Sequence, residues 1–385
     1  MADGEKPYRV YKGGRVRGKV PLAPRPERNP ERQRHDGRQA RAERRPRWGR
    51  RVGLALLLLV LLLVSWTVAG YLSFRAGVTD ANARLPKTVV GGLTRQEGAL
   101  ASNPSLILLL GTDGDKTPDR ADSSRSDSIL LVRTDPGRHR LAYLSIPRDL
   151  RVDIPGYGPN KINAAYQLGG TALTIKTVRA LTGLQPNHVV LVDFDAFRTV
   201  IDALGGVEID VPKPILSNRF ECPYSPARCE RWQGWRFGRG KQTMNGTRAL
   251  VYSRVRENRL DPRENDLSRG ERQQAVVEAM TDELVGLGTF VRLPFIGGDL
   301  VQPLTTDLSS GELLQLGWVR FRANSARALH CRLGGEPQSI GGQSVLIATE
   351  ENTAAIAMFT GRSAPQPPPP GTSFSAGCLV GRSAD

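Results

Sequence analysis

Hydrophobic residues follow two distinct patterns along this chain of 385 residues. The run from Val52 to Phe74 is 23 residues long and carries no charge. At a rise of about 1.5 Å per residue, it can cross a hydrocarbon core of roughly 30 Å. After it, short apolar runs bounded by glycine or proline alternate with segments of helical spacing. The two patterns together predict one membrane-spanning helix followed by an α/β body.

The short apolar runs predict the strands of a central mixed β-sheet, and the segments between them predict helices on both sides of it. The expected strands are 105–110, 128–134, 140–147, 188–194, 207–211 and 344–349. The expected helices are 171–183, 195–206, 268–287 and 308–319, the second with Asp195 as its N-cap. The turn sequence DPG, between the second and third strands, predicts a hairpin there.

This pattern divides the chain into five parts. They are a disordered basic tail (1–51), a transmembrane helix (52–74), a weakly structured stalk or linker (75–103), the main domain (104–350) and a Pro-rich C-terminal tail (351–385). The first part is predicted to be disordered because it is rich in Arg, Pro, Gly and Glu and has few apolar residues.

The net charge of +16 is concentrated in the tail. Residues 1–51 carry 17 Lys and Arg against 6 Asp and Glu, and the remainder carries 37 against 32. Basic residues flanking a span favour the cytoplasmic side, which puts the tail inside and the body outside the membrane. A cleavable signal peptide is the competing interpretation, but its apolar core would be shorter and its leader much shorter. Binding of the tail to DNA is the other alternative, and attraction to an anionic inner leaflet explains the charge more simply.

All four cysteines, Cys222, Cys229, Cys331 and Cys378, follow the span. An even number of cysteines in an oxidising compartment predicts two disulfides. Cys222 and Cys229 are close in sequence and are expected to pair, which leaves Cys331 to pair with Cys378 and tie down the C-terminal tail. A metal site is the alternative, although no histidine lies at ligand spacing from a cysteine.

Familiar enzyme motifs such as GxSxG, Walker A, HExxH and CxxC are absent, and the candidate chemistry rests on arginine and aspartate at strand ends. Asp113 follows one strand, Arg125 and Asp127 precede the next, and Arg148 and Asp149 follow a third. Guanidinium groups bind phosphate oxygens bidentately, and carboxylates are preferred ligands of Mg²⁺. Arginine and aspartate without histidine or cysteine indicate phosphoryl chemistry.

Six further arginines lie between Arg254 and Arg272, interleaved with carboxylates. By charge alone, the segment could equally be an exposed helix held by ion pairs at i,i+4 spacing. Asp261-Pro262 argues against one unbroken helix. For Arg259, Arg263 and Arg272 a solvated or structural role is the expectation, and Lys161 and Tyr166 could line the site or only pack a loop.

Several of these segments resemble the LytR–CpsA–Psr family of cell-wall glycopolymer ligases. The motifs that carry the resemblance occur in order over roughly residues 104–285: GTD (111–113), RSDSILLVRTDP, LSIPRDLRVDIPGYGPNKINAAYQLGG, HVVLVDFDAF, DALGGVEIDV, MNGTRALVYSRVR and DLSRGERQQ. The basic tail, single span and extracytoplasmic body also match the family's layout. The resemblance therefore implies a catalytic domain of the LytR–CpsA–Psr (LCP) type.

The resemblance implies a Mg²⁺-dependent phosphotransferase that moves a polyprenyl-pyrophosphate-linked glycopolymer onto peptidoglycan. The acceptor would be the 6-hydroxyl of N-acetylmuramic acid, and the new bond a phosphodiester. The excess of arginine (45) over lysine (9) hints at a GC-rich genome, so the polymer could be arabinogalactan-like or teichoic-acid-like. The alternatives are a polyprenyl-pyrophosphate hydrolase and a non-enzymatic, membrane-anchored regulator that binds wall polymer or lipid. No nucleic-acid partner is expected.

The resemblance also implies roles for individual residues. Asp113 and Asp127 match the Mg²⁺ positions. The pyrophosphate-binding positions are Arg125, Arg148, Arg254, Arg256 and Arg269, with Gln273 as a polar contact beside them. Asp266 is a further carboxylate of the site, and Asp149 or Asp266 is the candidate general base. The loop-rich insertion at about 212–246 departs from the family pattern and could contact sugar or be a pinned surface loop.

Overall fold

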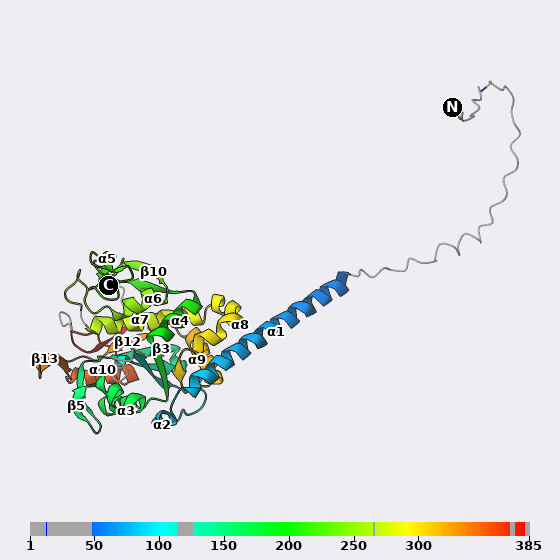
Figure 1. Cartoon of the computed structure of the whole chain (residues 1–385). Helices are drawn as coiled ribbons and strands as arrows, with labels where there is room; N and C mark the ends of the chain where they lie inside the picture. The colour runs from blue at the N-terminus through cyan, green and yellow to red at the C-terminus, as the bar shows by residue number, and fades with distance from the viewer. Residues whose placement is uncertain (1–12, 14–47, 114–125, 265, 370–373, 382–385) are drawn as a thin grey trace. The chain divides into compact units, whose positions relative to one another are not determined.

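The computed structural model describes residues 13, 48–113, 126–264, 266–369 and 374–381, without the side chains of Asp127 and Asp266. Contacts divide the chain into two units, Met1–Val60 and Leu61–Asp385. The first contains the start of helix α1 (Trp48–Ala83), and the second contains the rest of α1 and all the other elements (Figure 1).

Helix α1 is long and apolar enough to cross a membrane, with a mean hydropathy of 2.7 over its most apolar window. Within the described ranges, one other candidate exists, the pair α7 (Asp266–Leu284) and α8 (Leu287–Val301), which qualifies only if two helices bent by 85° are counted as one span. The far end of α1 does not lead into a weakly structured stalk as the sequence pattern predicts. Val78 and Ala81 on α1, and Val89 on the short helix α2 (Lys87–Val90), are buried in the body.

A seven-stranded mixed sheet forms the centre of the body, in the order β11-β6-β1-β2-β3-β12-β15. Its strands are β1 (Ser105–Thr112), β2 (Ser126–Asp135), β3 (Arg140–Ile146), β6 (His188–Asp193), β11 (Thr305–Thr306), β12 (Leu329–Arg332) and β15 (Gly377–Val380). The pairs β1–β6 and β3–β12 are parallel, and the other neighbours are antiparallel. The predicted hairpin of β2 and β3 is confirmed.

Successive side chains of the strands point to opposite faces of the sheet, and each face has its own helices. Leu108 and Leu131 pack on the side of α3 (Ala164–Thr182) and α10 (Glu351–Thr360). Ile107 and Leu130 pack on the other side, against residues of α7 and α9 (Ser310–Arg322). The predicted mixed sheet with helices on both sides is therefore confirmed. Because Ala355 and Phe359 of α10 are fully buried, the core continues into the segment predicted to be a tail.

A second apolar core lies between α4 (Phe194–Leu204), α6 (Gly246–Arg254), α7, α8 and the two-stranded sheet of β7 (Val207–Val211) and β10 (Gly240–Met244). The remaining strands form a four-stranded sheet and a two-stranded sheet. They are β4 (Leu150–Ile154), β5 (Gly158–Lys161), β13 (Glu336–Ile340) and β14 (Gln343–Ile347), then β8 (Ile215–Leu216) and β9 (Arg236–Phe237). The short helix α5 (Pro226–Cys229) lies in the insertion.

Two helix boundaries differ from the sequence prediction for local reasons. The N-cap of α4 is Asp193, whose carboxylate accepts a hydrogen bond from the Ala196 amide at 2.7 Å, so the helix begins before Asp195. The helix predicted from residue 171 begins at Ala164, because a kink at Gly170, with φ of 61°, joins two helical segments.

Both predicted disulfides, Cys222–Cys229 and Cys331–Cys378, are present. The second joins directly opposed residues of β12 and β15. It therefore fastens the last strand of the central sheet to the core, whereas the first closes a short loop within the insertion.

Candidate functional site

Neighbouring strands of the central sheet bring the predicted acidic and basic residues to one edge. Thr112 of β1 pairs with Ser126 of β2 on one side and with Asp193 of β6 on the other. Ile146 of β3 pairs with Ile129 of β2, so the residues after β3 lie at the same edge. The backbones of Asp113, Asp127 and Arg148 therefore lie at one edge of the sheet, at or just beyond the ends of three different strands.

Helix α7 lies across this edge and adds a second set of polar side chains. The Ser128 hydroxyl donates a hydrogen bond to Oε1 of Gln273 at 2.9 Å. Gly270 faces β3 so closely that a Cβ atom there would lie 2.6 Å from Oγ of Ser145. Glycine at position 270 thus lets the helix approach the sheet and places Arg269 and Gln273 beside the strand ends.

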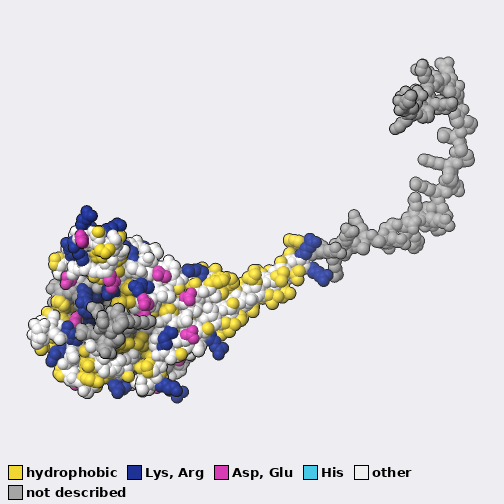
Figure 2. Space-filling model, in the orientation of Figure 1, with side chains coloured by type: hydrophobic (Ala, Val, Ile, Leu, Met, Phe, Trp, Pro, Cys, Tyr) yellow, Lys and Arg dark blue, Asp and Glu magenta, His cyan; other side chains and the backbone are white. Residues whose placement is uncertain are grey.

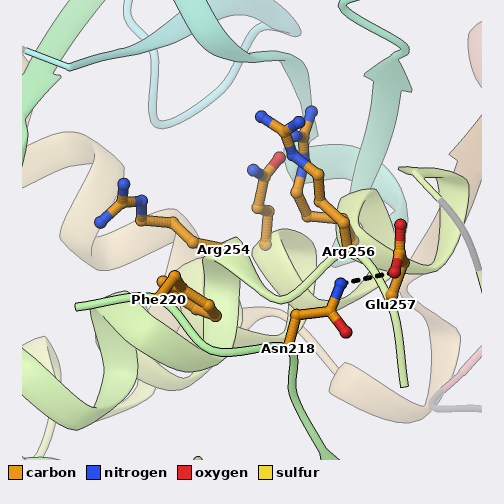
Figure 3. Close-up of a pocket in the computed structure, with 7 residues that line it drawn as sticks. Asn218, Phe220, Arg254, Arg256 and Glu257 are labelled. Carbon is orange, nitrogen blue, oxygen red and sulfur yellow. Dashed lines mark hydrogen bonds between the residues drawn. The ribbon is translucent and has the colours of Figure 1, made fainter. Parts of the chain in front are cut away.

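A pocket of about 320 Å³ opens at this place. Its lining residues are Asn218, Phe220, Arg254, Arg256, Glu257, Arg269 and Gln273. Three of these are arginines from three different segments: Arg254 at the end of α6, Arg256 in the connector after it and Arg269 in the first turn of α7. Figure 3 shows the first two of them. Since guanidinium groups repel one another, such a pocket suits an anion with several oxygen atoms.

Arg272 does not share this pocket, although it is only three residues from Arg269. Its side chain is buried, pairs with Glu264 at 2.6 Å and donates to the Val255 carbonyl. It stands beside Tyr252, where burial raises the phenol pKa to about 12 even though the Arg272 charge lowers it. Arg272 therefore connects the segment between α6 and α7 to α7, which is the structural role expected from the sequence.

The other two arginines of the cluster also have structural or solvated partners. Arg263 is exposed and pairs with Asp261 at 3.0 Å, and Arg259 donates to the Gln233 carbonyl at 2.9 Å. The six arginines thus divide into three that line the pocket and three that hold loops. Their charge does not distinguish the two groups, whereas their contacts in the folded chain do.

Asp149 is surrounded by cations at the end of β3. Its carboxylate lies 2.7 Å from Nζ of Lys161 and 3.5 Å from Nε of Arg148. Burial raises the pKa of Asp149, but the Lys161 hydrogen bond and the Arg148 and Arg269 charges together hold it below its ordinary value. A carboxylate stabilised in this way is a weak proton acceptor. The arrangement suits Asp149 better as the group that positions Arg148 and Lys161 than as a general base.

The insertion supplies pocket residues that the sequence did not identify. Asn218 donates a hydrogen bond to Glu257, drawn in Figure 3, and Phe220 lines the pocket beside them. Glu221 forms an ion pair with Arg254. The sugar contact predicted for this insertion stays a prediction. The aromatic residues of the insertion were the one feature of the sequence that could have indicated its place in the pocket.

The guanidinium of Arg254 is also held by aromatic rings. It lies 4.3 Å from the ring centroid of Phe194 and 5.9 Å from that of Phe220. In Figure 3 the Arg254 side chain extends away from Arg256. Rings and carboxylate together fix this guanidinium to one side of the pocket.

The Mg²⁺ prediction rests on carboxylates beside the pocket. Asp113 follows β1, and Asp193 ends the parallel strand β6. Burial is the largest cause of the raised pKa of Tyr166, and the charges of both aspartates raise it further. Among the side chains that are described, no group of three or more His, Cys, Asp or Glu could hold a metal ion. Asp113 and Asp127 are residues of the type whose oxygen donors a hard cation prefers, and such a cation also takes ligands from a bound phosphate.

The predicted site residues therefore have different outcomes. Four line the pocket: Arg254, Arg256, Arg269 and Gln273. Asp149 pairs with Arg148 and is close enough to Arg269, a pocket residue, for its charge to lower the Asp149 pKa. Asp113 lies at the same edge of the sheet. Arg125 lies outside the described residues, and for Asp127 and Asp266 only the backbone is described. The roles given to all of these residues remain predictions.

Comparison with known proteins defines the class. The sequence profile described as the LytR_cpsA_psr family matches residues 78–358. The chain is 33% identical over 250 residues to the regulatory protein MsrR of Staphylococcus aureus, covering 64% of this chain and 68% of MsrR. It is 28% identical over 268 residues to TagV of Bacillus subtilis, named polyisoprenyl-teichoic acid–peptidoglycan teichoic acid transferase, covering 68% of this chain and 65% of TagV. This chain belongs to the LytR–CpsA–Psr family.

Solved structures of relatives have the same fold. The crystal structure of B. subtilis TagV superposes with a TM-score of 0.54 at 26% identity, covering 69% of this chain and 99% of TagV. A structure of TagT bound to LI-WTA superposes with a TM-score of 0.53 at 25% identity, covering 69% of this chain and 94% of TagT.

Proposed function

We propose that this protein transfers a polyprenyl-pyrophosphate-linked wall glycopolymer to peptidoglycan. The observation that carries the proposal is the pocket that Arg254, Arg256 and Arg269 line. A diphosphate is the anion that such a set of guanidinium groups suits. Membership of the family and the transferase name of the relative TagV support the same reaction.

The reaction is a displacement at phosphorus. An acceptor hydroxyl oxygen attacks the phosphorus that carries the glycan, and the bond from this phosphorus to the bridging oxygen breaks. Polyprenyl phosphate leaves with that oxygen, the glycan gains a phosphodiester to the acceptor, and the hydroxyl proton passes to a base or to water. We assign the acceptor hydroxyl to carbon 6 of N-acetylmuramic acid and the donor glycan to an arabinogalactan-like or teichoic-acid-like polymer.

The chain's own residues would bind and orient the diphosphate. Arg256 and Arg269 hold its oxygens, and Gln273, fixed by Ser128, limits how they can rotate. Arg148, held by Asp149, adds charge at the end of β3. Mg²⁺, held by Asp113 and Asp127, would neutralise charge that develops on the phosphoryl oxygens. Such preorganised positive charge lowers the barrier because it needs no rearrangement during the reaction.

The protein is proposed to be anchored by α1, with residues 1–51 in the cytoplasm and the body outside. The length and hydropathy of α1 support the span. The basic tail supports the orientation, since Lys and Arg are enriched in cytoplasmic segments. Two disulfides in the body are in keeping with an oxidising compartment.

The test uses the full chain in lipid vesicles with a synthetic polyprenyl-pyrophosphate-linked oligosaccharide and a peptidoglycan fragment. The expected products are polyprenyl phosphate and a fragment that carries the oligosaccharide through a phosphodiester, both formed only when a divalent cation is present. Turnover that is unchanged in a chelator would remove Mg²⁺ from the proposal. Turnover that gives only free glycan phosphate, even with the acceptor in excess, would favour the hydrolase.

The non-enzymatic alternative also has a specific basis, because the relative MsrR is named a regulatory protein. A regulator would bind the donor without releasing polyprenyl phosphate. Donor binding with no product from the intact chain, while a control transferase consumes the same donor and acceptor, would overturn the enzymatic proposal in favour of this one.

A further inference from the structure

Helix α8 carries an exposed apolar face. Leu287 is 85% exposed and Phe295 is 73% exposed, with Phe290 and Val291 exposed between them. Spacings of three, four and eight residues place these side chains along one side of the helix. Ile296 and residues after it pack into the body instead. A contiguous apolar face of this kind marks a surface that is covered by a membrane or another molecule.

The same helix packs closely against α1 through small residues. A Cβ atom on Gly77 would lie 2.7 Å from the Gly298 carbonyl oxygen, and one on Gly297 would lie 3.2 Å from the Phe74 amide nitrogen. The Gly298 amide donates to Oγ of Ser73 at 3.1 Å. Close backbone approach through glycine and serine is typical of helix pairs within membranes.

The two helices run in the same direction. Gly70 of α1 lies against Leu293 of α8, and further along both helices Gly77 lies against Gln302. The N-terminal half of α8 therefore lies beside the apolar part of α1, which precedes Phe74. In Figure 2 the hydrophobic side chains of α1 adjoin others on the body where the helix reaches it.

One contact sets the depth of α8. The rings of Trp66 and Phe295 meet edge to face with centroids 5.4 Å apart. Trp66 is nine residues before Arg75, the first charge after the apolar run, which is roughly 13 Å along a helix. If Val52–Phe74 spans the bilayer, Phe295 lies below the level of the membrane surface. Arg292, the charged residue in this half of α8, turns to the body and donates to the carbonyls of Ala203 and Leu204.

We propose that the N-terminal half of α8, Leu287–Phe295, lies in the outer leaflet of the bilayer beside α1. The proposal rests on the span and orientation given under the proposed function. Two elements at membrane depth, rather than a flexible tether, then fix the height and rotation of the body. Helix α7 joins this half-helix to the pocket, since Gln273 is eleven residues, roughly 16 Å of helix, from Leu284. The pocket is thereby held at a set distance from the lipid that carries its substrate.

The test places a single spin label in the full chain reconstituted in vesicles at low protein density. All four native cysteines are in disulfides, so one added cysteine is labelled alone. The labelled variants are Phe290→Cys on α8, Leu62→Cys on α1 as the span control, and Ile340→Cys on β13 as the exposed control. The measurement compares collisions of the label with oxygen, which concentrates in hydrocarbon, and with a water-soluble nickel chelate.

The label at position 290 is expected to behave like that at position 62, with high oxygen and low nickel accessibility. A label at 290 that is as accessible to nickel as the one at 340 overturns the proposal. So does protection from both reagents that disappears on dilution with lipid, because a second copy then covers the face. A label at 62 that is open to nickel shows instead that the anchor, and with it the proposed topology, has failed.

A second readout separates membrane seating from folding. The double variant Phe290→Glu and Val291→Glu should lose transfer from a long-chain donor embedded in vesicles, while transfer from a short-chain, water-soluble donor is retained. Equal loss with both donors, or no loss with either, contradicts the proposal.

Discussion

Glu221 of the insertion and Arg254 at the end of α6 form an ion pair at the wall of the pocket. Glu221 has a positive φ of 47°, which is uncommon for a residue other than glycine, so the loop holds it in a particular conformation. The Glu221 carboxylate is paired with the Arg254 guanidinium, which the proposed diphosphate would also bind. The insertion is therefore part of the pocket and would compete with the proposed diphosphate.

Replacing Glu221 with Gln should strengthen pyrophosphate binding, because a negative charge beside the anion is removed and Arg254 is released. Both partners are partly exposed, so we expect a gain of about 1 kcal/mol or less, up to roughly fivefold in affinity. Isothermal titration with inorganic pyrophosphate measures it. Glu208→Gln, which breaks the exposed pair with Lys241 on β7 and β10, is the matched control and should change nothing.

Arg256→Ala should weaken pyrophosphate binding. Hydrogen bonds to charged groups are worth about 1.5–3 kcal/mol, which corresponds to a loss of roughly 10- to 150-fold. Arg256 is exposed and, within the described part of the chain, has no ion pair to lose, so the fold should tolerate the change. Arg263→Ala removes an equal charge from the same segment outside the pocket. Equal losses in the two variants would show that only the general charge matters.

The two disulfides should differ in what they stabilise. From loop closure, Cys331–Cys378, with a separation of 47 residues, should contribute roughly 4 kcal/mol, and Cys222–Cys229, with a separation of 7, roughly 2.5 kcal/mol. Alanine at both positions of each pair, followed by thermal unfolding, tests the order. Only the Cys222/Cys229 variant should also change pyrophosphate binding, because Phe220 and Glu221, which contact Arg254, directly precede Cys222. The opposite order of stability would contradict this assignment.

Acid should remove the contribution of Asp149 to stability. Since its pKa in the folded protein is depressed, the contribution is complete above the unfolded pKa of about 4 and is lost as the pH falls through the lower folded value. The difference in unfolding free energy between the wild type and Asp149→Asn, measured with urea, should be constant from pH 8 to 5. It should shrink below about pH 4. A difference that changes around neutrality would mean that Asp149 titrates there, as a general base could.

Local patterns in the sequence determined much of the fold. A charge-free run of 23 residues has few alternatives to a span. Short apolar runs between turn residues predicted β1, β2, β3 and β6 of the central sheet, but β7 and β14, predicted in the same way, pair in smaller sheets. Cysteine spacing was enough for both disulfides. Helix α10 was not predicted, because it is apolar on nearly every side and its sequence therefore does not alternate between apolar and polar residues with the period of a helix. The structure of residues 75–103 was not predicted, although Val78, Ala81, Leu85 and Val89 are buried and recur at spacings of three and four residues.

The motifs also indicated which residues gather at the pocket, but only the tertiary structure decided what each one faces. Arg256 and Arg272 have the same charge and lie in the same segment. One lines the cavity from the connector after α6, and the other lies on α7, where it is buried against Glu264. The pairing of Glu221 with Arg254, and of α8 with α1, joins segments 33 and more than 200 residues apart. Periodicity and charge are properties of neighbours in sequence, whereas such contacts depend on how distant elements pack.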